Sequence, residues 1–198
     1  MQSQSLIRAV VDAAALRHNL RQVRRTAPDS RVMAVIKANA YGHGLVPAAK
    51  ALAEADGFAV ARLGEGLALR AAGLTNRILL LEGVFSADQL AAAAQARFEL
   101  MVHSFEQLAL LDALTGDARV TAWIKVDSGM NRLGFRLDDF SAAYERLRRN
   151  VHVHAEPTLV THLASADDRR DPQTRRQLDA FAAATSGLAG ARSIANSA

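Results

Sequence analysis

The sequence predicts an α/β protein whose alternating parallel strands and helices form a (β/α)8-type barrel. Short runs rich in Val, Leu and Ile recur along the chain, and each is followed by an Ala-rich stretch with helical spacing. The early runs return about every 20 to 25 residues, close to the shortest workable unit of strand, helix and two loops. The 198 residues can bury a sizeable core, and because no linker or low-complexity tract interrupts them, we expect one domain over residues 1–198.

Seven strands are expected in chain order, at residues 32–36, 57–61, 78–81, 98–102, 120–126, 158–161 and 192–194. Repeated strand and helix units imply parallel strands joined by right-handed crossovers. An open doubly wound sheet is the alternative, and it would gather polar residues near a single switch point. Polar residues instead follow nearly every strand, which favours a barrel with one shared rim: Lys37, Glu82, His103, Lys125, Asp127, His162, Asn196 and Ser197.

The helices between these strands carry recognisable start signals. Ser86 and Ser104 are each followed three residues later by Gln, the pattern of a capping box. Asp171 before Pro172 predicts an N-cap with Pro at the first helical position. A further helix near 139–149 has an apolar stripe typical of packing against a sheet.

The length conflicts with a closed barrel. Such barrels usually take about 250 residues and eight strands, whereas this sequence ends soon after its seventh strand. We therefore expect a barrel truncated after the seventh strand, with two strand edges left open unless a partner covers them.

Composition excludes several classes of protein. Half of the residues are hydrophobic and 22% are charged, but no apolar run approaches the roughly 20 residues of a membrane span. The absence of Cys excludes disulfides, thiolate zinc sites and cysteine nucleophiles, and with no export signal visible we expect a cytoplasmic protein. His152, His154 and Glu156 could imitate a metal site, but a polar loop is the better interpretation, so no metal is expected.

The net charge of +4 raises the alternative of a nucleic-acid-binding protein. The arginines, however, lie in small groups along the chain with few aromatic residues between them, which is typical of solvated helix faces. We therefore expect no nucleic-acid or membrane partner.

Lysine is rare in this sequence, and Lys37 stands out. Only three of the 24 Lys and Arg residues are Lys, and Lys37 follows a predicted strand and precedes a small, Gly-containing loop. Unlike Arg, a lysine can lose its proton and attack a carbonyl, most readily where it is removed from water. The alternative is a Lys that pairs with a neighbouring carboxylate, and chemistry alone leaves both open.

The segment AVIKANAYGHG at residues 34–44 resembles the cofactor-lysine signature of alanine racemases, which use pyridoxal 5′-phosphate (PLP). The segments WIKVDSGMNRLGF (123–135), VTHLASAD (160–167) and SIANSA (193–198) resemble the later motifs of that family in the same order. The resemblance covers the whole chain but only about the first half of a family member. It implies a PLP-binding barrel, a second and mostly β domain that this sequence lacks, and active sites shared across a homodimer.

The resemblance also implies roles for individual residues. Lys37 would hold PLP covalently and act as the base on the D-alanine side, while Tyr41 and Ser197 would bind the phosphate. Arg132 would approach the phenolic oxygen of PLP and the carboxylate of the substrate, alanine. Ordinary structural roles remain as alternatives: a loop aromatic for Tyr41, a turn residue for Ser197 and a surface ion pair for Arg132.

Four further residues would surround the cofactor. The lysine equivalent to Lys125 is carbamylated in some family members and steadies the arginine, although unmodified pairing with Asp127 is the alternative. His162 and Asn196 would contribute to hydrogen bonds near the ring. Leu81 would pack beside it, with core packing as the alternative.

Racemisation needs a second acid or base on the opposite face of the substrate. The family supplies a tyrosine from the partner subunit, whereas the only tyrosines in this sequence are Tyr41, assigned to phosphate, and Tyr144, on an apolar helical stripe. Two functions follow: an alanine racemase that is incomplete as a 198-residue chain, or a PLP-binding barrel fragment without racemase turnover.

Overall fold

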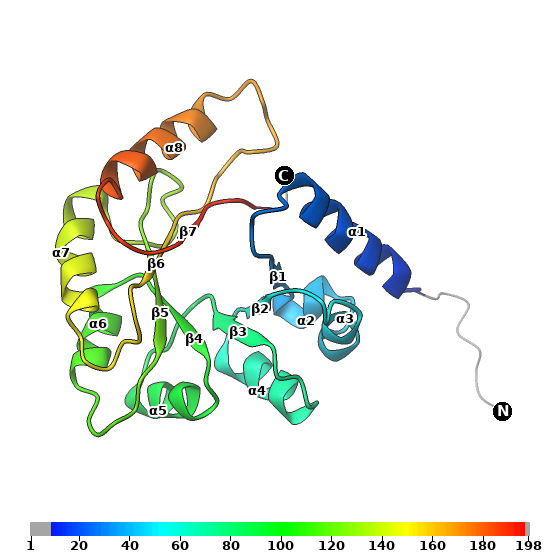
Figure 1. Ribbon diagram of the computed structural model, residues 1–198, viewed down its shortest axis with the longest axis horizontal. Coiled ribbons are helices and arrows are strands. Elements are labelled where there is room, and N and C mark those ends of the chain that lie inside the picture. Colours follow the sequence, from blue (N-terminus) through cyan, green and yellow to red (C-terminus); the bar gives the residue numbers. More distant parts are fainter. Residues whose placement is uncertain (1–8, 197–198) are drawn as a thin grey trace.

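The computed structural model describes residues 9–196, in which strands and helices alternate along the chain (Figure 1). The strands are β1 (Met33–Val35), β2 (Gly57–Val60), β3 (Arg77–Leu80), β4 (Glu99–Val102), β5 (Thr121–Lys125), β6 (Thr158–Val160) and β7 (Arg192–Ser193). The helices are α1 (Ala13–Thr26), α2 (Lys37–Tyr41), α3 (Leu45–Ala51), α4 (Leu63–Ala71), α5 (Ala87–Gln95), α6 (Phe105–Asp112), α7 (Leu137–Arg148) and α8 (Gln173–Ala184). No helix in this range is long and apolar enough to cross a membrane.

All seven strands predicted from the sequence are confirmed, and they form one parallel sheet in chain order from β1 to β7. Figure 1 shows the sheet curling so that the helices lie on its outer side. Within residues 9–196, β1 and β7 are the ends of the strand order and each pairs on one side only. The structure is therefore a parallel barrel interrupted between its first and seventh strands, as the sequence predicts.

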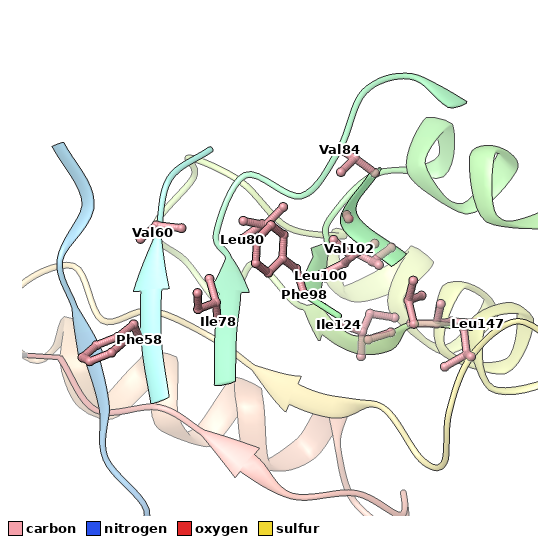
Figure 2. Close-up of a cluster of buried hydrophobic side chains, with 14 of the residues drawn as sticks. Phe58, Val60, Ile78, Leu80, Val84, Phe98, Leu100, Val102, Ile124 and Leu147 are labelled. Carbon is pink, nitrogen blue, oxygen red and sulfur yellow. The ribbon is translucent and has the colours of Figure 1, made fainter. Parts of the chain in front are cut away.

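Alternate residues of each strand build two separate cores. Side chains on the outer face pack beneath the helices, and Figure 2 shows Phe58 and Val60 of β2 beside Ile78 and Leu80 of β3 in this outer core. The residues between them point the other way and form a small inner core: Ala59, Leu79, Met101, Trp123 and Val160. Because both faces of the sheet are buried, the strands read as continuous apolar runs rather than as alternating ones.

A polar cluster lies beside the inner core at the amino-terminal ends of the strands. Glu99 is 7% exposed and accepts a hydrogen bond from Nε1 of Trp123 at 2.7 Å. The Arg77 guanidinium of the neighbouring strand donates through both Nε and Nη2 to the two Glu99 oxygens. This two-point geometry is the strongest form of carboxylate pairing, and it offsets the cost of burying the charge.

The predicted helix starts are largely confirmed. The hydroxyls of Ser86 and Ser104 accept hydrogen bonds from the Gln three residues later, at 3.2 and 3.4 Å. The Gln side chains reach one residue further back than a standard capping box, to the N–H of Phe85 and of His103. The third start differs slightly, because the helix begins at Gln173 and Pro172 is its cap.

The helix predicted near 139–149 is α7, and its apolar stripe is buried as expected. Phe140, Tyr144 and Leu147 are each no more than 2% exposed. The Tyr144 hydroxyl donates to Glu156 and to the Ala189 carbonyl, at 3.2 and 3.1 Å. Burial and the Glu156 carboxylate raise the pKa of Tyr144, so this phenol stays protonated at neutral pH.

Candidate functional site

The residues predicted to carry chemistry follow the carboxyl ends of the parallel strands. Lys37 comes two residues after β1, Lys125 is the last residue of β5 and His162 comes two residues after β6. Leu81 directly follows β3 and packs on the inner core. Since all strands are parallel, these ends share one rim, where side chains from distant parts of the sequence can act on one ligand.

Lys37 is half-buried at this rim. Within residues 9–196, the structure records no ion pair or hydrogen bond for its ammonium group. The alternative interpretation of this residue, a lysine paired with a neighbouring carboxylate, is therefore not what the structure shows. An amine at a barrel rim without a carboxylate partner can receive a carbonyl compound.

The short helix α2 is left-handed in the four residues that follow Lys37. Ala38, Asn39, Ala40 and Tyr41 have φ values of 51°, 56°, 53° and 54°. For residues with a Cβ, this conformation costs roughly 1–2 kcal/mol each, with Asn the most tolerant type. Such strain is retained where surrounding contacts fix it, and it is concentrated at functional sites. Sequence analysis did not predict this turn.

Hydrogen bonds to the starts of α3 and α4 stabilise this turn. The Asn39 side-chain oxygen accepts a hydrogen bond from the Leu45 N–H at 2.8 Å, which ties the turn to the start of α3. The Glu65 carboxylate on α4 accepts from the Ala61 N–H at 2.8 Å and from the Asn39 N–H at 3.4 Å. Glu65 thereby links the end of β2 to the turn that follows Lys37. Sequence analysis missed this residue, although Glu at the third position of a helix is a known capping signal.

Lys125 and Arg132 belong to one polar structure. Lys125 is 7% exposed, and its Nζ donates to the Leu133 carbonyl at 2.7 Å instead of pairing with Asp127. The Asp127 carboxylate accepts from the N–H groups of Gly129 and Asn131, both at 3.0 Å. These bonds stabilise the loop of residues 128–133, which carries Arg132 and is called the Arg132 loop below. Burial lowers the pKa of Lys125, and the Arg132 charge lowers it further.

Arg132 lies exposed on this loop, where a cavity of about 520 Å³ opens. Among residues 9–196, no ion pair is recorded for its guanidinium, so the alternative of a surface salt bridge is not observed. Its five donors remain available for an anion.

The pKa of His162 is lowered by burial and by three positive groups. Burial lowers its pKa, and the positive charges of Arg132, Lys125 and Lys37 each lower it further. These cations come from two parts of the chain, the end of β1 and the end of β5 with its following loop, and their charges act on one imidazole. Positive groups around His162 suit a ligand carrying phosphate or carboxylate groups.

His103, the rim residue after β4, is held by the end of the neighbouring strand β3. Its Nε2 lies 3.1 Å from the Glu82 carbonyl, which also accepts from the Gln107 amide at 2.9 Å. The Glu82 carboxylate pairs with Arg62 at 3.2 Å. His103 and Glu82 therefore tie strand ends together, and burial lowers the pKa of His103.

The two histidines predict a pH dependence of stability. Because burial depresses the pKa of both His103 and His162 below 6.5, the unfolded chain binds more protons than the folded chain around pH 6. The free energy of unfolding should therefore fall between pH 7.5 and pH 5.5, above the range in which carboxylates titrate. Urea unfolding at the two pH values measures this difference, and it should shrink when both histidines are replaced by Gln. An unchanged difference in that double variant would contradict the assignment.

The remaining predicted site residues are Tyr41, Asn196 and Ser197. Tyr41 is 60% exposed, so it is not packed on the rim as an ordinary loop aromatic would be. Asn196 is half-buried and its amide lies 3.4 Å from the Leu163 carbonyl, in the segment that follows His162. Ser197 lies outside the described residues.

Of the three residues that could imitate a metal site, His152 and Glu156 have separate side-chain partners. The His152 ring lies 2.9 Å from the Ala118 carbonyl, while Glu156 accepts the hydrogen bond from Tyr144. Within the part of the chain that the structure describes, no group of three His, Asp or Glu side chains could hold a metal ion.

Comparisons with known proteins agree with this arrangement. The sequence profile described as "Alanine racemase, N-terminal domain" matches residues 11–198. The alanine racemase of Halorhodospira halophila is 51% identical over 192 residues, which cover 96% of this chain and 53% of that protein. The alanine racemase of Aeromonas hydrophila is 46% identical over 190 residues, with the same coverage of both. The chain spans about half the length of the curated relatives it matches.

Solved structures give the same result. The biosynthetic alanine racemase of Pseudomonas aeruginosa matches with a TM-score of 0.89 at 44% identity, over 94% of this chain and 52% of that one. A histidine racemase from Leuconostoc mesenteroides matches with a TM-score of 0.82 at 26% identity, over 93% of this chain and 51% of that one. With seven parallel strands, a rim lysine and a profile match that reaches from residue 11 to residue 198, the chain belongs to the alanine racemase N-terminal domain family.

Proposed function

We propose that this chain is the PLP-binding barrel portion of an alanine racemase, which interconverts L-alanine and D-alanine. One observation carries the proposal: Lys37, Lys125 and His162 lie at the carboxyl ends of the parallel strands β1, β5 and β6, and Arg132 lies on the loop after β5, so all four belong to one rim of the barrel. The proposal also includes a cytoplasmic location, which rests on the family resemblance.

The residues at this rim fit PLP. The cofactor carries an aldehyde, a phosphate and a phenolic oxygen, and it therefore needs an amine, anion-binding donors and a positive environment. Lys37 supplies a half-buried amine without a carboxylate partner in residues 9–196. Arg132 and Lys125 supply positive charge, and Tyr41 presents an exposed hydroxyl.

Lys37 has two proposed tasks, attaching the cofactor through its amino nitrogen and moving a proton. When bound, PLP withdraws the electrons left as the bond between the α-carbon and its hydrogen breaks. The Lys37 nitrogen would take that proton, or return it, on the face of the substrate that corresponds to D-alanine. The hydroxyls of Tyr41 and Ser197 would donate to the phosphate.

Five more residues would arrange the cofactor environment. Arg132 would donate to the phenolic oxygen and to the substrate carboxylate, for which its planar fork of donors is suited. Lys125 holds the Arg132 loop through the Leu133 carbonyl, and its buried amine is a candidate for carbamylation. His162 and Asn196 would supply hydrogen bonds near the ring, and Leu81 an apolar wall.

The opposite face of the substrate needs its own acid. Tyr144 cannot serve, because it is buried on α7 with its hydroxyl bonded to Glu156 and Ala189. By resemblance to the family, a tyrosine of a partner subunit would complete the site in a homodimer. A second candidate function follows from the same point: the 198-residue chain binds PLP but does not turn over alanine.

Alanine is proposed as the substrate because the curated relatives at 46–51% identity are named alanine racemases. The structural match to a histidine racemase shows that the same barrel occurs in a racemase named for a larger amino acid. Substrate choice would then depend on groups beyond the shared fold.

The test measures PLP uptake and D-alanine formation in the same samples. The 198-residue chain and a version extended by its downstream reading frame are each supplied with PLP and L-alanine. We expect both to bind PLP with a visible absorbance and the extended chain to form D-alanine. Turnover by the 198-residue chain alone would reject the second candidate function, and failure of both chains to bind PLP would reject the proposal.

A further inference from the structure

Gln177 is a buried amide that the roles proposed so far do not use. It lies on the inner side of α8 and is 1% exposed. Its Oε1 accepts a hydrogen bond from the Ala164 N–H at 2.8 Å, and its Nε2 donates to the His162 carbonyl at 2.9 Å. A buried amide must satisfy both ends, and here both ends are satisfied by the backbone on either side of Leu163.

The same side chain also contacts the loop that carries Arg132. Its Nε2 lies 3.5 Å from the Ser128 hydroxyl, and that hydroxyl lies 2.7 Å from the hydroxyl of Thr161. Gly129 has a φ of +132°, and a Cβ added there would lie 3.4 Å from Cγ of Gln177. The helix therefore packs close to the first residues of this loop.

A second amide of α8 strengthens the connection. Gln173 lies one turn before Gln177, and its Nε2 donates to the Gly129 carbonyl at 2.9 Å. Two glutamines on one face of α8 thus connect the helix to the segments after β5 and after β6. These segments carry Arg132 and His162.

We propose that Gln177 is a positioning residue that fixes His162 relative to the Arg132 loop and thereby aligns the side of the site that faces the PLP ring. The inference rests on the proposed function for its cofactor, but the alignment itself concerns only residues of this chain. Gln177 is assigned no contact with the ligand, because it is buried and its polar atoms bond to backbone and hydroxyl partners.

The chain offers a matched control in Gln107. This glutamine on α6 is 4% exposed, accepts from the His103 N–H at 2.9 Å and donates to the Glu82 carbonyl at 2.9 Å. It therefore has the same residue type, similar burial and the same pair of bonds, one accepted from a backbone N–H and one donated to a backbone carbonyl. Neither His103 nor Glu82 has a proposed contact with the cofactor, so Gln107→Leu reports the cost of losing such a bridge without disturbing His162.

The test compares Gln177→Leu with Gln107→Leu in the full chain, first without cofactor. The ring signals of His162 and the amide signals of residues 128–133 are followed by NMR, together with hydrogen exchange at Ala164. We expect Gln177→Leu to shift these signals and to speed exchange at Ala164 by about tenfold or more, while Gln107→Leu leaves them in place. Unchanged His162 and loop signals in Gln177→Leu would overturn the proposal, whether or not the chain binds PLP.

The second measurement is the PLP dissociation constant. We expect Gln177→Leu to weaken PLP binding by about tenfold and Gln107→Leu by less than about twofold, although both lower the urea midpoint. Equal weakening in the two variants would overturn the proposal, because Gln177 would then be only a structural residue. If the wild-type chain does not bind PLP, the proposed function fails, and the cofactor-free signals alone decide on Gln177.

A third variant tests the donor end of the amide. Gln177→Glu keeps an acceptor for the Ala164 N–H, but its ionised form has no donor for the His162 carbonyl. On protonation a carboxyl group regains one donor. The PLP affinity of this variant, taken as a ratio to wild type at each pH, should therefore improve as the pH is lowered. A ratio that does not change with pH would contradict the assigned bond.

Discussion

Replacing Lys37 by alanine is expected to abolish the covalent attachment of PLP to this chain. Treatment with borohydride fixes an attached cofactor, so wild-type protein should gain the mass of one reduced PLP on the peptide that contains Lys37. The variant should gain none and should lose the visible absorbance, because no other described lysine combines a rim position with an amine free of hydrogen bonds. Peptide mass mapping after reduction measures both outcomes.

Two further variants serve as controls: one tests a different lysine, and the other keeps the charge at position 37 but removes the amine. Lys50 lies exposed in the last turn of α3, and Lys50→Ala should leave the attachment unchanged. Lys37→Arg keeps a positive charge at the rim but cannot condense with an aldehyde, so it should bind PLP without covalent attachment. A reduced cofactor found on Lys125 or Lys50 of the wild-type chain would contradict the assignment of Lys37.

The second large effect is expected at the amino-terminal ends of the strands. Glu99→Ala should lower the free energy of unfolding by about 3 kcal/mol, because it leaves the Arg77 guanidinium and the Trp123 N–H without their shared acceptor. Arg77 is partly exposed and can regain some hydration, which keeps the loss at the lower end of the range for buried ion pairs. Urea unfolding measures the loss.

Two comparisons make this result specific. Glu99→Gln retains an acceptor for Trp123 and should lose less stability than Glu99→Ala. Asp179→Ala breaks an ion pair with Arg175 whose partners are 81% and 60% exposed, and its effect should be small. The interpretation fails if Glu99→Ala costs no more than Asp179→Ala.

The strands and their order could be predicted because the signal that defines them is local and repeated. Strands β1 to β6 are short, mainly apolar runs, and they stay apolar because both faces of the sheet are buried, as Ala59 and Phe58 on opposite faces of β2 show. The short strand β7, Arg192–Ser193, is the exception. The polar cluster below the inner core could not be predicted. Arg77 and Glu99 lie 22 residues apart, and charged residues inside a strand are usually assigned to solvent.

Sequence analysis could name candidate site residues that lie in motifs or directly after strands. It could not name residues whose position depends only on packing between distant segments. Lys37, Lys125 and His162 were predicted from their positions after strands, and the structure places them on one rim. Gln177 was missed because a glutamine in an Ala-rich helix reads as a surface residue. Its partners are backbone atoms of a loop, and a sequence does not show which loop a helix covers.

The left-handed turn after Lys37 limits which substitutions the chain can accept. At four successive positions, a side chain branched at Cβ would clash with its own backbone, so natural variation at residues 38–41 should be confined to Gly, Ala, Asn and a few unbranched types. A peptide cut from this segment would not keep the left-handed form, because Glu65 and Leu45 would be absent. The geometry around the lysine is thus a property of the assembled barrel, and no fragment of the segment can reproduce it.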